Sequence, residues 1–341
     1  MKMDLYLLLA LVIFGVVLVN GWTDAPNSIA TAVATRSMGV NRAIFMAAIC
    51  NFLGVWGMAF FNASVANTMS SMLDFTSGDA KKSALALLAG MCSVILFSCA
   101  AWFFGIPTSE SHGLIAGITG AALYLNGTSA LCMNQWGKVL TGLVISLTLG
   151  FLLGYFLTIL VRFLGRFLTR RVAASLFPKG EVLCAAAMAV VHGAQDGQKF
   201  IGVFLIAAML RDGTAAGREI SLAGQWNMIL VCAVVMAVGT MIGGKRIIRC
   251  VGFGITPLKQ YEGLCADLAS VCSLFLSTCM GFPVSTTHVK TMAVVAVGFS
   301  QKGKHVQIRM VKQMVFAWIV TFPACIVFGY LLTGFAFHFF Y

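Results

Sequence analysis

Apolar residues form ten long runs along the chain, separated by short polar or charged segments. The runs lie near residues 3–20, 43–66, 84–104, 106–125, 139–161, 182–210, 226–243, 264–280, 282–299 and 314–340. Most approach the length of about 20 residues that an α-helix needs to cross about 30 Å of hydrocarbon. They are continuous, whereas the strands of an outer-membrane barrel alternate between apolar and polar positions. The pattern predicts an all-α polytopic membrane protein with about 10–12 transmembrane helices.

Composition excludes a soluble globular protein. The chain is 60% hydrophobic and 10% charged, against about 45–50% apolar and about 25% charged residues in soluble domains. In a soluble protein, the formal net charge of +12 would suggest nucleic-acid binding. Here the basic residues lie mostly between apolar runs, so we attribute the charge to membrane topology and expect no nucleic-acid partner. The 11 cysteines lie nearly all inside apolar runs and never as CxxC, so neither a disulfide framework nor a zinc site is supported.

A basic stretch divides the ten runs five and five. We expect a first repeat over residues 1–161, a cytoplasmic linker over 162–181 with a break at Phe177–Gly180, and a second repeat over 182–341. With this linker inside and one crossing per run, 15 of the 23 basic residues fall on the cytoplasmic side and 6 outside. This asymmetry obeys the positive-inside rule and predicts both termini outside.

An odd number of crossings in each half has a topological consequence. If the two halves are homologous, they must be inverted relative to each other in the membrane. Treating segments 84–125 and 264–299 as re-entrant hairpins removes two crossings from each half and leaves the inversion intact.

Two motifs occur once in each half, in the same order and at nearly the same spacing. The sequence GWTDAPN at Gly21–Asn27 is matched 172 residues later by GAQDGQK at Gly193–Lys199. The sequence GIPTSESH at Gly105–His112 is matched 176 residues later by GFPVSTTH at Gly281–His288. The agreement of order and spacing indicates an internal duplication.

The first motif places an acid, amides and helix-breaking residues inside an apolar run. Such a set interrupts a transmembrane helix and frees backbone carbonyls, which is tolerated at that depth where they line a cavity. A carboxylate inside the membrane is costly and is normally paired. Asp24 and Asp196 are therefore candidate cation or proton sites. The alternative is that each acid caps a helix or bonds a neighbouring helix.

The second motif places proline, hydroxyls and a histidine at the start of an apolar run. Proline suits a first helical turn, and hydroxyls with free backbone N–H groups at a helix N-terminus form an anion site. Two such ends facing each other from inverted halves would hold a tetrahedral oxyanion. The alternative is ordinary capping by Ser109 and Ser285, with His112 and His288 bonding a carbonyl.

These strings resemble the signatures of the inorganic phosphate transporter (PiT) family, over both halves and without the long soluble insertion of animal members. The resemblance implies an inverted-repeat secondary transporter that carries phosphate. The phosphate ligands it implies are Ser109, Ser111, Ser285, Thr286 and Thr287. The cation or proton ligands it implies are Asp24, Asn27, Asp196 and Asp267, the last from an acidic position 18 residues before Ser285.

The chain also departs from the family pattern. Met91 stands where the first half would carry the partner of Asp267, and Thr108 and Glu110 are unusual in the first hairpin. Lys199 aligns with Asn27, and its ammonium would repel a metal ion at Asp196, neutralise that carboxylate or touch the phosphate. We hypothesise the loss of one of two symmetric sodium positions, which favours proton coupling or a reduced sodium count. Snorkelling of Lys199 away from the cavity is the alternative.

Two further charges have open roles. Lys290 is expected to pair with Glu110 or with Asp267, or to add positive potential near the anion. Glu110 is expected to pair with a cation rather than to act as a general acid.

The sequence thus predicts a symporter in the plasma membrane of a bacterium that imports inorganic phosphate with H⁺ or Na⁺ by alternating access. Sulfate and metal-complexed phosphate are alternative substrates. An intramembrane enzyme is disfavoured because no GxSxG or HExxH motif occurs, and a channel is a further rival. We expect no resident cofactor or metal. A homodimer is expected by resemblance alone.

Overall fold

The computed structural model describes residues 4–75, 78–104, 108–213, 225–243, 245–301 and 306–340. Within these ranges the chain is helical, with one isolated β-bridge between Leu73 and Leu131. The first half contains α1 (Leu5–Thr23), η1 (Ala25–Ser28), α2 (Ala30–Ala34), α3 (Val40–Phe61), α4 (Ser64–Ser71), α5 (Ala80–Phe104), α6 (Glu110–Asn126), η2 (Gly127–Ala130) and α7 (Met133–Gly165). The second half contains α8 (Arg170–Asp212), α9 (Trp226–Ile242), α10 (Lys245–Gly254), α11 (Gln260–Cys279), α12 (Thr286–Phe299) and α13 (Ile308–Phe340). The all-α membrane fold is confirmed.

Seven of the ten apolar runs correspond to helical segments long enough to span a membrane, and three correspond to shorter helices. Seven segments in the described ranges are long and apolar enough to cross a membrane: Leu5–Ala34, α3, α5, α7, α8, α11 and α13. The other three runs form α6, α9 and α12, of 17, 17 and 14 residues. Because about 20 residues are needed for a crossing, α6 and α12 are short enough for the re-entrant alternative, whereas their hairpin partners α5 and α11 are long enough to cross.

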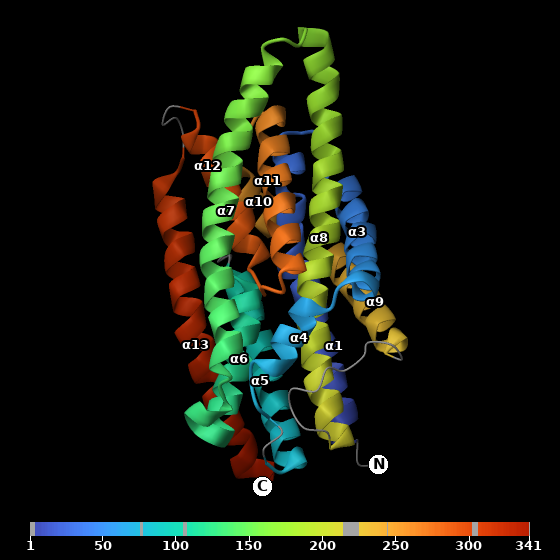
Figure 1. Cartoon of the computed structure of the whole chain (residues 1–341), viewed down its shortest axis with the longest axis vertical. Helices are drawn as coiled ribbons and strands as arrows, with labels where there is room; N and C mark the ends of the chain where they lie inside the picture. The colour runs from blue at the N-terminus through green and yellow to red at the C-terminus, as the bar shows by residue number, and fades with distance from the viewer. Residues whose placement is uncertain are drawn as a thin grey trace.

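Helix contacts come in reciprocal pairs between the halves. Helix α1 packs against α9 while α3 packs against α8, and α13 lies along α6 while α7 lies along α12. In Figure 1, α6 runs toward one end of the molecule and α12 toward the other. Two inverted repeats require such reciprocity, so it supports the predicted inversion.

The turn between α7 and α8 lies at one end of the molecule, and α1 begins and α13 ends at the opposite end (Figure 1). Most of the predicted linker is helical, because α7 continues to Gly165 and α8 begins at Arg170. The expected break at Phe177–Gly180 is wrong, since α8 continues through Pro178. The carbonyl freed by that proline belongs to exposed Ala174, where solvent can satisfy it.

The expected helix interruption occurs in the first half and not in the second. The first span breaks between α1 and α2, where Pro26 lacks an N–H and the Ser28 hydroxyl bonds the carbonyl of Ala25 at 2.7 Å. Helix α8 passes through Gly193–Lys199 without a break, because this copy of the motif contains no proline. Its glycines serve packing instead, since a Cβ on Gly193 would overlap the backbone of Asn51 on α3.

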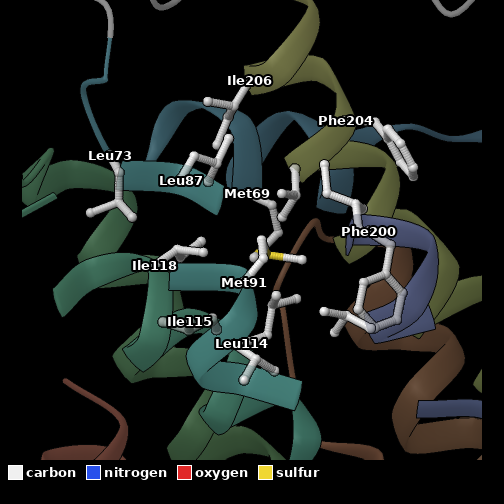
Figure 2. Packing of buried hydrophobic residues seen from close by; sticks show 14 of the residues in the cluster. Met69, Leu73, Leu87, Met91, Leu114, Ile115, Ile118, Phe200, Phe204 and Ile206 are labelled. Atoms are coloured by element: carbon white, nitrogen blue, oxygen red, sulfur yellow. The ribbon is translucent and has the colours of Figure 1, made fainter. Parts of the chain in front are cut away.

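The largest buried apolar cluster joins first-half helices to α8 and α9 and includes Met91 and Phe200 (Figure 2). Met91 is fully buried near Met69, Leu87 and Leu114. The first half therefore has apolar packing where the second half has the charged Asp267.

Candidate functional site

The N-termini of α6 and α12 meet at the centre of the molecule. Ser109 and Ser285 are their N-caps, and each hydroxyl accepts a hydrogen bond from the backbone N–H of the histidine three residues later, at 3.3 Å. The two Oγ atoms lie 2.7 Å apart. The capping alternative is thus correct for both serines, and the two caps also bring two positive helix ends together. Residues Gly105–Pro107 of the motif lie outside the described ranges.

Asp24 lies in the break between α1 and α2 and points at the N-terminus of α12. Its Oδ1 accepts hydrogen bonds from Asn27 Nδ2 and Thr287 Oγ1, both at 2.5 Å. Its Oδ2 accepts one from Thr286 Oγ1 at 3.0 Å. The carboxylate is 1% exposed. The second-motif hydroxyls of one half therefore hold the first-motif acid of the other half.

Lys199 connects Asp196 to both hairpins. Its Nζ donates to Asp196 Oδ1 at 2.6 Å, to Ser111 Oγ at 2.5 Å and to the carbonyl of Val284 at 2.7 Å. The residue is 1% exposed, so snorkelling is excluded. All three ammonium hydrogens have acceptors, which makes Lys199 a fixed cation within this site.

Asp196 has a second set of partners on its other oxygen. Asn20 Nδ2 donates to Asp196 Oδ2 at 3.1 Å, and His192 Nε2 lies 3.3 Å from the same atom. His192 Nδ1 is bonded to Asn51 Oδ1 at 2.9 Å, which fixes the ring against α3. One ligand atom each from Asp24, His192 and Asp196 lie within 4.8 Å of one another, so this is where a small cation would find ligands.

Asp267 lies in a separate cluster. It forms an ion pair with Lys290, and Thr31 Oγ1 donates to its Oδ1 at 2.6 Å. Lys290 thus pairs with Asp267, whereas Glu110 accepts a hydrogen bond from Ser98 at 2.5 Å. Among the described residues Glu110 forms no ion pair, so the expected pairing with a cation is not found.

The ten predicted site residues therefore fall into two groups. The polar network at the centre contains nine of them: Asp24, Asn27, Ser109, Ser111, Asp196, Lys199, Ser285, Thr286 and Thr287. Asp267 is the tenth and stands outside it with Lys290.

The two motif histidines do not bond a carbonyl as the capping alternative expected. The rings of His112 and His288 contact each other with centroids 4.4 Å apart, and the His288 ring lies 3.9 Å from that of Trp318. Within the described ranges neither ring nitrogen of His288 has a hydrogen-bond partner. Both rings instead pack against aromatic side chains of α13, His112 against Phe322 and His288 against Trp318.

Three polar residues of structural importance were not singled out from the sequence. Gln195 Nε2 donates to the carbonyl of Phe282 at 2.8 Å and so holds the second hairpin tip. Gln198 Oε1 accepts the backbone N–H of Val65 at 3.1 Å, at the start of α4. Glu181 Oε2 accepts from Thr35 at 2.7 Å and Ser37 at 2.5 Å. The sequence feature that could have identified Gln195 and Gln198 is an amide inside an apolar run, and for Glu181 it is a single acid next to a basic stretch.

The arrangement at the centre can bind an oxyanion. Two helix N-termini, several hydroxyl donors and one ammonium converge from four segments far apart in sequence. The chemistry that these groups supply is hydrogen bonding and positive charge, which suits binding of an anion.

Comparison with known proteins agrees with this geometry. A model described as the phosphate transporter family matches residues 20–329. The chain is 30% identical over 325 residues to a "Probable low-affinity inorganic phosphate transporter" of Bacillus subtilis, covering 94% of this chain and 95% of that one. It is 33% identical over 305 residues to a protein with the same description in Rhizobium meliloti, covering 89% and 88%.

A solved structure has the same fold. "The sodium-dependent phosphate transporter" superimposes with a TM-score of 0.86 at 19% sequence identity, covering 99% of this chain and 100% of that chain. The resemblance seen in the motifs is confirmed by the family match. The chain is therefore a multi-pass membrane protein of the phosphate transporter family, a transport protein and not an enzyme.

Proposed function

We propose that the protein imports inorganic phosphate across the bacterial plasma membrane as a proton-coupled symporter working by alternating access. The observation that carries the proposal is the meeting of the α6 and α12 N-termini beside the Lys199 ammonium. The phosphate ligands in this proposal are Ser109, Ser111, Ser285, Thr286, Thr287 and Lys199. Lys199 would exchange its bond to Ser111 or to the Val284 carbonyl for one to a phosphate oxygen. The coupling ligands are Asp24 and Asn27, with Asp196 neutralised by Lys199.

Phosphate is favoured over sulfate by the neighbouring acceptors. Near neutral pH phosphate carries O–H groups that donate hydrogen bonds, whereas sulfate carries none. The Asp24 carboxylate is bonded to the same α12 hydroxyls that would hold the anion. A phosphate O–H could donate to that carboxylate, while a sulfate oxygen would be repelled by it.

Charge balance supports one transported cation at this centre. Two carboxylates, Asp24 and Asp196, face one ammonium, Lys199, with all three side chains buried. One negative charge is left on Asp24 when His192 is neutral, and a buried uncompensated charge is costly. A proton on Asp24 removes that cost.

Sodium at the same position is the second candidate. Asn27 Oδ1 is buried and has no hydrogen-bond partner in the described part of the chain, so it offers a free oxygen ligand beside Asp24. The structural neighbour is also titled as sodium-dependent. Against sodium at both symmetric positions, Lys199 occupies in the second half the place that Asn27 has in the first.

The proposed organisation keeps the predicted topology. The halves 1–161 and 182–341 move relative to each other about the central site, the α7–α8 turn faces the cytoplasm, and both termini face outside. Association into a homodimer is part of the same proposal.

The test is uptake of labelled phosphate and labelled sulfate into proteoliposomes under an imposed pH gradient without sodium. The proposal expects phosphate, and not sulfate, to accumulate above its outside concentration, with counterflow of labelled against unlabelled phosphate. Equal accumulation of sulfate would contradict the substrate, and an absence of counterflow would indicate a channel.

A further inference from the structure

A second cluster of buried ionisable side chains lies between α2, α8, α11 and α12. Its two carboxylates are Glu181 and Asp267 and its ammonium is Lys290, and all three residues are 0% exposed. The hydroxyls that bond them belong to Thr31, Thr35 and Ser37. Glu181 takes no part in the anion site described above.

The cluster lies toward the end of the molecule that carries the α7–α8 turn. Glu181 precedes Asp196 by 15 residues on the continuous helix α8, which at 1.5 Å per residue corresponds to about 22 Å. Glu181 is thus far from the central carboxylates and on the side where the basic residues place the cytoplasm.

Asp267 has its own counter-ion, whereas Glu181 has none among the residues that the structure describes. Asp267 is ion-paired with Lys290, and Lys290 Nζ also donates to Thr31 at 3.0 Å. Glu181 has only hydroxyl partners, on Oε2, and its Oε1 has no hydrogen-bond partner within the described ranges. One negative charge in the cluster is therefore uncompensated whenever Glu181 is ionised.

This charge pattern repeats that of the central site. Each cluster contains two buried carboxylates and one lysine, and in each the lysine is bound to one carboxylate. Asp24 is the unpaired acid of the first cluster, and Glu181 is the unpaired acid of the second. Because burial penalises the ionised form, both unpaired acids are suited to take up a cation.

Packing around Glu181 favours a proton over a metal ion. A Cβ on Gly263 of α11 would overlap Glu181 Oε1, so the backbone of α11 lies directly against that oxygen. A metal ion needs room for a shell of several ligands, whereas a proton needs none. Ser37, bonded to the other oxygen, is half-buried and so is partly accessible to solvent.

We propose that Glu181 is a second proton-binding residue, which takes up one proton in each transport cycle in addition to the one on Asp24. This inference rests on the proposed proton-coupled import of phosphate. In the outward-facing state, a hydronium ion from the external side gives up a proton to the Glu181 carboxylate and becomes water, and the O–H bond forms. In the inward-facing state this bond breaks, the proton passes to water beside Ser37, and the carboxylate recovers its negative charge.

The test is the equilibrium accumulation of H₂PO₄⁻ in proteoliposomes under a fixed pH gradient, with the membrane potential clamped at zero. Two coupled protons predict about 100-fold accumulation per pH unit, and one predicts about tenfold. The native protein is expected to show the higher ratio and Glu181→Gln the lower one, with counterflow persisting. Glu181→Asp retains the carboxylate and is expected to restore the native ratio.

The matched control is Glu262→Gln. Glu262 is also buried, but its carboxylate bonds the backbone N–H of Lys259 at the start of α11, so its loss is expected to leave the ratio unchanged. A native ratio of tenfold per pH unit, or a native ratio in Glu181→Gln, overturns the inference while the proposed function stands. A native protein without proton-driven accumulation overturns both.

Discussion

The two copies of the first motif differ in what they do with a buried aspartate. In the first half, Pro26 breaks the helix, and Asp24 is held by hydroxyls and an amide, without an ion pair to any described residue. In the second half, α8 is continuous, and Lys199 lies 2.6 Å from Asp196 as a permanent counter-ion. Under the proposed function, the first copy keeps a place for a mobile cation and the second copy has a lysine in that place.

Removal of the unpaired charge should have the largest effect. Asp24→Asn is expected to lower proton-driven phosphate accumulation by at least about tenfold per pH unit, because the amide cannot carry the coupling proton. The protein should remain folded, because Asn preserves the size of the side chain. Uptake assays on reconstituted protein measure this.

Asp4→Asn is the matched control for that variant. Asp4 is the exposed N-cap of α1 on the same helix, and accepts from the backbone N–H of Tyr6 at 3.2 Å. Normal concentrative transport by Asp24→Asn would remove Asp24 from the coupling mechanism.

Making the motif around Asp196 more like the motif around Asp24 should change the protein's response to sodium. Lys199→Asn leaves Asp196 without its ammonium, and loss of one partner of a buried ion pair costs about 3–5 kcal/mol. We expect a lower Tm in sodium-free buffer and recovery of Tm as sodium binds at Asp196. The native protein should show no such shift in a thermal unfolding assay at matched ionic strength, with choline as the replacement cation.

A Tm of Lys199→Asn that is equal to the native value in both buffers would contradict the role of Lys199 as a built-in counter-ion. The related variant Lys199→Arg keeps the charge and is expected to show no sodium dependence, although its planar head does not fit three acceptors in the same way.

The helix caps test whether the two hairpins contribute equally to the anion site. Ser109→Ala and Ser285→Ala each remove a cap worth about 1 kcal/mol and a hydroxyl of the site. Both should raise KM for phosphate by about fivefold to tenfold, within twofold of each other. Ser129→Ala, an exposed serine on η2, is the control. An effect confined to one cap would show that only one helix end binds the anion.

The smallest effect is expected at Glu110, which by the 176-residue offset occupies the place of Thr286. Thr286 reaches Asp24 across the interface between the halves, whereas Glu110 bonds Ser98 within its own hairpin. Thr286→Val should therefore reduce phosphate uptake about fivefold, and Glu110→Gln by no more than about twofold. Initial rates of uptake compare the two, and a loss above tenfold in Glu110→Gln would assign it a role in coupling.

Much of the helical architecture follows from the sequence, because the thickness of the bilayer sets the length of an apolar run. The ten runs and the duplicated strings predicted the helices and nine of the residues that meet at the centre. The uninterrupted path of α8 did not follow, since glycine in a motif can break a helix or serve packing, and only the contact between Gly193 and Asn51 distinguishes the two.

Contacts between residues far apart in the sequence could not be predicted either. Lys290 had three possible roles until the fold brought it to Asp267. Glu181 gave no motif at all, because its partners Thr35 and Ser37 lie 146 and 144 residues away and are common residue types. Such contacts depend on tertiary packing and leave no local pattern.

The central claim is that Lys199 has taken the place of a second coupling sodium ion and that protons drive transport. The most direct test is phosphate accumulation by the native protein under an inward sodium gradient, with the pH gradient clamped at zero. The account predicts no accumulation above the outside concentration under these conditions. Sodium-driven accumulation that persists at zero pH gradient would contradict it.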